Sequence, residues 1–174
     1  MYIPLNRGIL NFDMPPFGKG AAEQKAEGLF HRYKAAIIAR FGRGPLSDTQ
    51  IDEYGREAFG PVWGGVGDQR LTLEPGRYYV VNTSYSPKSR GEHWVAIATS
   101  RAGIVHLFDS FARNGSHLMP KLAAGIRKKG AGRHFIESDR TDAEQRGASA
   151  VCGHLSLAWL SVVRDLGIRA ALRI

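Results

Sequence analysis

The stretch HWVAIATSRAGIVHLFD, residues 93–109, decides the fold because it contains two strand-like runs joined by a very short connection. The runs 93–99 and 103–109 are rich in β-branched and aromatic residues, and only the segment SRA separates them. This length predicts an antiparallel hairpin. If the first run ends opposite the start of the second, His93 lies directly across from Asp109, with Cβ atoms ~5 Å apart. The hairpin therefore predicts an imidazole and a carboxylate within hydrogen-bonding reach of each other.

The alternation of side chains along a strand separates His106 from this pair. His106 falls on the face of Ile104 and Phe108, opposite to Asp109, so we assign it to packing or to the sheet surface. The alignment of His93 with Asp109 is conditional on the turn, because a loop longer by one residue would shift the register by one.

The rest of the sequence supplies further strands and several helices. Strands are predicted at 77–83 and 133–138, helices at 21–41, 47–59, 115–130 and 150–166, and a glycine-rich loop at 60–71. At the start of the second helix, Ser47 and Gln50 have the spacing of a capping box. In the third helix Pro120 must lie in the first turn, because proline has no backbone N–H to donate. These elements predict an α+β fold.

The composition limits the class of protein. A chain of 174 residues fits one domain, and 43% hydrophobic with 23% charged residues is typical of a globular protein. No run approaches the ~18 apolar residues of a membrane span, and the N-terminus lacks a secretory signal. We therefore expect a protein that is not secreted, and a single cysteine suits a reducing compartment.

The positive charge and the N-terminal region leave alternatives open. A net charge of +8 and a pI near 9.9 favour an acidic partner such as nucleic acid, and scattered surface arginines explain them equally well. We divide the chain into an N-terminal arm with an amphipathic helix at 1–45 and a second part at 46–174 within one compact unit. The amphipathic helix either docks on the core or serves as a basic helix for a membrane or an acidic partner.

Cys152 lies at the predicted start of the last helix. Such a cysteine is either a small buried apolar residue or a reactive thiol. The unpaired amides and the dipole at a helix N-terminus favour the thiolate, and a nearby imidazolium would lower the thiol pKa further. His154 cannot supply that imidazolium, because residues two apart point to different sides of a helix. We expect His93, oriented by Asp109, to supply it.

Gln145 lies seven positions before Cys152 and would complete a reaction centre. Its side-chain amide can donate to a developing oxyanion together with the backbone N–H of Cys152. The alternative for Gln145 is a solvent-exposed loop amide. A metal site is rejected, because the sequence contains no CxxC, no HxxxH and no second thiol.

Several segments resemble the adenovirus protease family (adenain) and, more distantly, the SUMO-specific proteases of the same fold. They are GEHWVAIA with His93, HLFDSF with Asp109, and QRGASAVCGHLSLAWL with Gln145 and Cys152. Their order His, acid, Gln, Cys is the family's order, although adenoviruses have Glu where this chain has Asp109. The segments GPVWGGVGDQRL and VVNT also resemble the region before the family's histidine, so the similarity covers about residues 46–166.

The resemblance implies a central mixed sheet flanked by helices, with the nucleophile at the N-terminus of a helix. His93 would be the general base, Asp109 its orienting carboxylate, Cys152 the nucleophile and Gln145 the oxyanion donor. The implied activity is that of a viral or virus-like cysteine endopeptidase, acting in the virion or inside the host cell on virion precursor proteins at glycine-containing sites. The alternatives are an isopeptidase that removes a ubiquitin-like protein and a catalytically silent, basic DNA-binding virion protein.

Two further sets of residues follow from the resemblance and the charge. Trp63, Gly64 and Gly65 are expected to form one wall of a narrow substrate entry. A patch that binds DNA, or a merely solvated helix end, is predicted at Lys121, Arg127, Lys128, Lys129 and Arg133. The family is stimulated by DNA and by a disulfide-linked viral peptide. Because this chain has no second cysteine, we expect no required cofactor, and stimulation by DNA or by a noncovalent peptide.

Overall fold

The computed structural model describes residues 20–84, 93–129, 135–138, 143–145 and 150–174, apart from the side chains of residues 128 and 129. The N-terminal arm thus lies outside the described residues. The elements are α1 Ala21–Phe41, α2 Asp48–Phe59, η1 Gly60–Val62, β1 Trp63–Asp68, β2 Tyr78–Asn82, β3 Trp94–Thr99, β4 Val105–Phe108, α3 Gly115–Leu118, α4 Pro120–Lys129, β5 Ile136–Glu137, α5 Cys152–Leu166 and α6 Ile168–Ala171. They form an α+β fold, as predicted.

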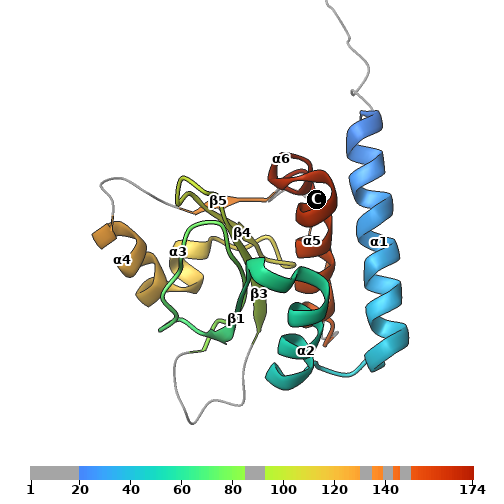
Figure 1. Ribbon diagram of the computed structural model, residues 1–174, viewed down its shortest axis with the longest axis horizontal. Helices are drawn as coiled ribbons and strands as arrows, with labels where there is room; N and C mark the ends of the chain where they lie inside the picture. The colour runs from blue at the N-terminus through green and yellow to red at the C-terminus, as the bar shows by residue number, and fades with distance from the viewer. Residues whose placement is uncertain (1–19, 85–92, 130–134, 139–142, 146–149) are drawn as a thin grey trace, which may run out of the picture.

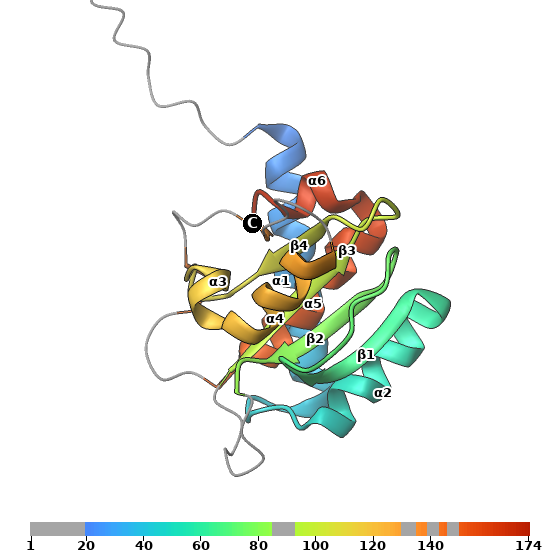
Figure 2. The ribbon, with the colours of Figure 1, turned by 90° about the vertical axis from the view of Figure 1, so that its left-hand side faces the viewer.

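The strands form one mixed sheet with helices on both faces (Figures 1 and 2). The strand order is β1-β2-β3-β4-β5; β1–β2 and β4–β5 are parallel and the two central pairs are antiparallel. One core cluster lies between the sheet and α5, and includes Phe108 and Trp159. A second cluster lies on the other face, where Leu122 and Ile126 of α4 pack against the strands.

The β3–β4 hairpin is confirmed, but its register differs by two residues from the predicted one. Thr99 pairs with Val105, and the Ser100 N–H donates to the Ile104 carbonyl at 2.8 Å. Gly103 has a φ of 76° and belongs to the turn rather than to the strand. A shift of two residues leaves every side chain on its predicted face, because the side-chain period of a strand is two.

Strand β1 is missing from the sequence prediction, which had a glycine-rich loop at these positions. Its glycines are required by close packing: a Cβ on Gly64 would lie 2.3 Å from the Tyr79 ring, and one on Gly67 would lie 2.8 Å from Leu71. Glycine inside a strand commonly marks such a close approach. The glycines that make this segment look like a loop in the sequence are therefore present because side chains of other segments pack closely against it.

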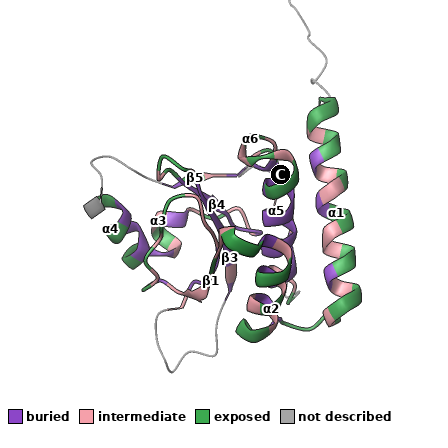
Figure 3. Ribbon diagram, viewed as in Figure 1, coloured by how far each residue is buried: buried purple, intermediate pink, exposed green. Residues whose placement is uncertain are grey.

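Helix α5 is the central helix of the fold, and it lies between the sheet and α1 (Figure 1). Its sequence is apolar on nearly every side, and its residues 153–163 are all buried (Figure 3). A helix of this kind must be covered on all faces. Helix α1 covers the outer side: Phe30 is fully buried and its ring lies 5.8 Å from that of Phe108. The amphipathic helix thus docks on the core, which is one of the alternatives that the sequence left open.

Helix α2 begins as predicted and is clamped to α1. The Ser47 side chain accepts from the Gln50 N–H while the Gln50 side chain accepts from the Ser47 N–H, which confirms the capping box. Arg40 at the end of α1 reaches Glu53 at 2.7 Å and Glu57 at 2.8 Å on α2. Because these ion pairs are exposed, each adds little to the stability of the fold.

The predicted helix at 115–130 is two helices, α3 and α4, and α6 was not predicted. The break falls at Met119, directly before Pro120, which takes the first position of α4. Proline is tolerated there because its missing N–H would have no partner inside the helix. Met119 is fully buried in the second cluster, so the break also turns a long side chain into the core.

We expect Phe30→Ala to lower the free energy of unfolding by about 3–5 kcal/mol, because it opens a cavity between α1 and the buried face of α5. The measurement is denaturant unfolding followed by circular dichroism. Arg32→Ala, at an exposed position of the same helix, is the control and should change stability little. Equal stabilities of the two variants would show that α1 is not part of the cooperative core.

Candidate active site

Three of the predicted site residues meet at one end of the sheet. His93 immediately precedes β3, Asp109 immediately follows β4, and Cys152 is the first residue of α5. The antiparallel β3–β4 pairing brings the start of one strand to the end of the other. Helix α5 crosses the same sheet with its N-terminus at this end, since the Trp94 N–H donates to the Cys152 Sγ at 3.5 Å.

The imidazole of His93 is hydrogen-bonded to the carboxylate of Asp109, as predicted. The distance from His93 Nε2 to Asp109 Oδ1 is 2.5 Å, and the two side chains are 5% and 2% exposed. Burial alone would lower the pKa of His93, but the bonds to Asp109 and Cys152 and the charges of both outweigh burial and raise it. With Nε2 engaged by Asp109, Nδ1 is the ring nitrogen left to face the sulfur.

The Asp109 carboxylate lies in a turn that the sequence prediction did not identify. Its oxygens accept from the Phe111 N–H at 3.2 Å, the Arg113 N–H at 3.0 Å and the Arg113 Nε–H at 2.9 Å. Burial would raise the pKa of Asp109, but these donors and His93 hold it far below its usual value. Aspartate at the first position of a turn was the available signal for this arrangement.

The thiol of Cys152 lies between Trp94 and His93. Burial would raise its pKa, but the hydrogen bond with His93, the Trp94 N–H and the positive charge of His93 outweigh burial and lower it. A raised imidazole pKa beside a lowered thiol pKa favours a thiolate–imidazolium pair, which is the reactive form of a nucleophilic cysteine. The helix N-terminus adds backbone amides beside the sulfur.

Gln145 is buried rather than exposed in a loop. It is 4% exposed, its backbone N–H donates to the Ser110 carbonyl at 2.9 Å, and its Oε1 accepts from the Ser110 hydroxyl at 2.9 Å. Ser110 directly follows Asp109, so this contact ties Gln145 to the candidate site. With Oε1 held by Ser110, the Nε2 end of the amide is the donor end, as an oxyanion contact requires. The neighbouring residues 146–149 lie outside the described residues.

The proposed substrate wall is not at this site. Trp63 pairs with Tyr78 at the start of β2, whereas the site lies beyond Asn82 at its end. The Trp63 indole donates to Asp52 at 2.8 Å and packs against Gly55, where a Cβ would lie 2.3 Å from the ring. Trp63 thus joins α2 to the sheet, and Gly64 and Gly65 follow it at the same distant end. The structure thus places these three residues away from Cys152, because 63–68 is a strand rather than the predicted loop.

The described part of the predicted basic patch lies on α4, on the sheet face opposite to α5 (Figure 2). Lys121 and Arg127 are exposed there, and the Lys121 N–H is tied to the Gln69 side chain at 3.2 Å. The side chains of Lys128 and Lys129 and the whole of Arg133 lie outside the described residues. The described part of the patch is therefore separate from Cys152.

Two further histidines, His106 and His154, are buried away from the sulfur; a packing position was predicted for His106. His106 is buried between the strands that flank β4, where it pairs with Ala98 and Ile136. His154 is fully buried, and its Nε2 lies 2.8 Å from the carbonyl oxygen of Gly42. Burial lowers the pKa of both imidazoles, so both are neutral near neutral pH.

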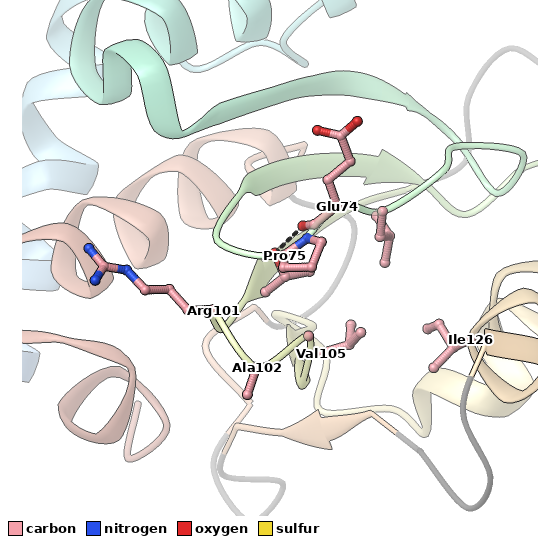
Figure 4. A pocket seen from close by; sticks show the side chains of 9 residues that line it. Glu74, Pro75, Arg101, Ala102, Val105 and Ile126 are labelled. Atoms are coloured by element: carbon pink, nitrogen blue, oxygen red, sulfur yellow. Dashed lines mark hydrogen bonds between the residues drawn. The ribbon is translucent and has the colours of Figure 1, made fainter.

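A cavity of about 310 Å³ lies at the opposite end of the sheet from Cys152 (Figure 4). It is bounded by Glu74, the β3–β4 turn with Arg101, and Val105 facing Ile126 of α4. The side chains of Glu74 and Arg101 point away from its centre. None of the predicted catalytic residues lines it, so the candidate site is defined by its side-chain chemistry rather than by this hollow.

The described residues lack two features that would indicate other kinds of site. In that part of the chain, no three His, Cys, Asp or Glu side chains are grouped so as to hold a metal ion. None of its helices has the length and apolar character that crossing a membrane requires. No known protein-family model matches the sequence, and no curated protein matches it.

We expect His93→Ala to raise the pKa of Cys152 toward that of an ordinary thiol, about 8.5, because the paired imidazolium is lost. The measurement is the rate of alkylation by iodoacetamide as a function of pH. In the native chain the thiolate persists to lower pH, so alkylation should decline at a lower pH than in the variant. His117→Ala, which removes an exposed histidine, should leave the profile unchanged. Identical profiles for the native chain and His93→Ala would contradict the pairing.

Proposed function

We propose that the protein is a cysteine endopeptidase related to the adenovirus proteases. The observation that carries the proposal is the contact of Cys152 with His93, whose other ring nitrogen is held by buried Asp109. This order of thiol, imidazole and carboxylate is the arrangement that nucleophilic catalysis by cysteine requires. The resemblance of the segments around these residues to the adenovirus protease family supports the same conclusion.

In the proposed reaction, the Cys152 thiolate attacks the carbonyl carbon of the scissile peptide bond. The negative charge that develops on the carbonyl oxygen is stabilised by the backbone N–H of Cys152 and by the side-chain amide of Gln145. The His93 imidazolium gives its proton to the leaving amine, and the C–N bond breaks to leave an acyl-enzyme thioester. Neutral His93 then takes a proton from water as the water oxygen attacks the thioester carbonyl carbon. The C–S bond breaks, the N-terminal product leaves with a new carboxyl group, and the Cys152 thiolate and His93 imidazolium are restored.

Asp109 has two roles in this scheme. Its bond to Nε2 fixes the ring so that Nδ1 faces the sulfur, and its charge stabilises the imidazolium that is paired with the thiolate before attack. Ser110 holds the carbonyl end of the Gln145 amide and so directs the donor end. The turn after β4 therefore supplies both the carboxylate that orients His93 and the hydroxyl that holds the oxyanion donor.

A catalytically silent scaffold is the weaker alternative. A structural role for Cys152 would require only a small apolar side chain at the start of α5. It would not require a lowered thiol pKa or an imidazole oriented by a buried carboxylate. Such perturbed groups cluster at functional sites. The virion precursor substrate, cleavage at glycine-containing sites and stimulation by DNA rest on the family resemblance and on the net charge of +8.

We expect Cys152→Ala to abolish cleavage of a co-produced capsid precursor while the circular dichroism spectrum stays native. Cut sites in the native digest, read by mass spectrometry, should contain glycine. Ser156→Ala, one turn further along α5, is the matched control and should retain cleavage. Undiminished cleavage by Cys152→Ala would remove the assignment.

An electrophilic, glycine-terminated peptide should label Cys152 rapidly near neutral pH, because the thiolate is already formed. A digest that offers both the capsid precursor and a ubiquitin-like fusion distinguishes the isopeptidase alternative. An isopeptidase would cut the ubiquitin-like fusion in preference to the capsid precursor. Labelling no faster than that of a free thiol in the unfolded chain would favour the silent scaffold.

A further inference from the structure

The carboxylate of Asp109 has two positively charged neighbours. His93 lies on Oδ1 at 2.5 Å, and Arg113 donates from Nε to Oδ2 at 2.9 Å. The Asp109 side chain is 2% exposed, whereas that of Arg113 is 44% exposed. One buried negative charge is thus shared between a buried imidazole and a guanidinium that reaches in from solvent.

The guanidinium of Arg113 is held in this position by the ring between it and His93. Arg113 Cζ lies 4.9 Å from the centre of the Phe111 ring, and that ring lies 5.1 Å from the His93 ring. A cation over an aromatic face is attracted by the ring quadrupole. The turn that presents Phe111 and Arg113 places Ala112 at a φ of 55°, a conformation that a non-glycine residue adopts only when the surroundings demand it.

The guanidinium is not needed to orient the carboxylate. The backbone N–H groups of Phe111 and Arg113 already bind Oδ1 at 3.2 Å and Oδ2 at 3.0 Å. Any residue at position 113 other than proline keeps its N–H. The Arg113 side chain therefore adds a positive charge in contact with the Asp109 carboxylate, which also binds His93.

We propose that Arg113 is a positioning residue that shares Asp109 with His93 and so limits how strongly this carboxylate holds the imidazolium. The electrostatic part of this inference stands on the contacts alone, and its catalytic consequence rests on the proposed function. The charged and titratable groups that face the His93–Asp109 pair in the described structure are Cys152 and Arg113.

The direction of the effect follows from Coulomb's law. Arg113 repels the imidazolium of His93 and attracts the thiolate of Cys152, so its charge lowers the pKa of both groups. Without it, the pKa of each should rise. A histidine that holds its proton too strongly is a poor base for the water that attacks the acyl-enzyme. Arg113 would thus keep His93 able to give a proton in the first half of the reaction and to take one in the second.

The test is an NMR titration of the His93 imidazole in the full chain and in variants of position 113. Arg113→Gln and Arg113→Met remove the charge, and the methionine keeps an apolar stem against Phe111. Both should raise the pKa of His93 by roughly half a pH unit, the scale expected of a partly solvated charge beyond direct contact. Arg113→Lys, which keeps the charge, should restore most of the native value.

Arg77→Gln is the matched control. Arg77 has a similarly exposed side chain, 39%, and also pairs with a carboxylate, Glu74, but it lies at the opposite end of the sheet. Its removal lowers the net charge equally and should leave the His93 titration unchanged. Only variants that remain folded are compared. If a folded Arg113→Gln or Arg113→Met variant has the same His93 pKa as the native chain, or a lower one, the inference is overturned.

The kinetic readout is separate from the titration. If the chain cleaves its substrate, the acidic limb of the pH profile of kcat should move to higher pH in Arg113→Gln. The shift should equal the change in the His93 pKa, since deacylation needs neutral His93. The NMR titration reads His93 whether or not the chain cleaves anything. Failure of the proposed function would instead appear as retained cleavage in Cys152→Ala.

Discussion

The buried contact between His93 and Asp109 is the interaction on which the rest of the site depends. A carboxylate that is 2% exposed is tolerated only when its charge is paired and its oxygens are hydrogen-bonded. Here the partners come from three places: the start of β3, the backbone of the turn after β4, and the Arg113 side chain. The register of the hairpin and the shape of that turn are therefore coupled, since a change in either would leave a buried charge without its donors.

The position of the sulfur depends on a different constraint, the burial of residues 153–163 of α5. Because residues 153–163 are all buried, this helix cannot slide or rotate without opening the core on both sides. Its first residue, Cys152, is thereby held at the end of the sheet beside His93. Helix α1 contributes to this placement, although it lies far from the chemistry, because Phe30 fills the outer side of the same core.

The turn after β4 organises the site beyond the triad. Within a few residues it provides the carboxylate of Asp109, the hydroxyl that orients Gln145, the ring that packs on His93 and the guanidinium that shares the carboxylate. The described hollow at the other end of the sheet and the basic residues of α4 belong to other parts of the molecule. The electrostatic balance of the site is thus set mostly by one short segment and by the helix that faces it.

The sequence by itself determined the hairpin, the capped start of α2 and the position of Cys152 at a helix start. These are local features, and strand alternation kept His93 and Asp109 on one face even though the turn shifted the register by two residues. Only the tertiary structure decided that 63–68 is a strand, that Trp63 lies far from the site and that α1 belongs to the core. It also decided that Arg113 shares the carboxylate of Asp109. Periodicity and turn chemistry report a segment's own preferences, whereas close backbone approach and the sharing of a buried charge depend on residues distant in the chain.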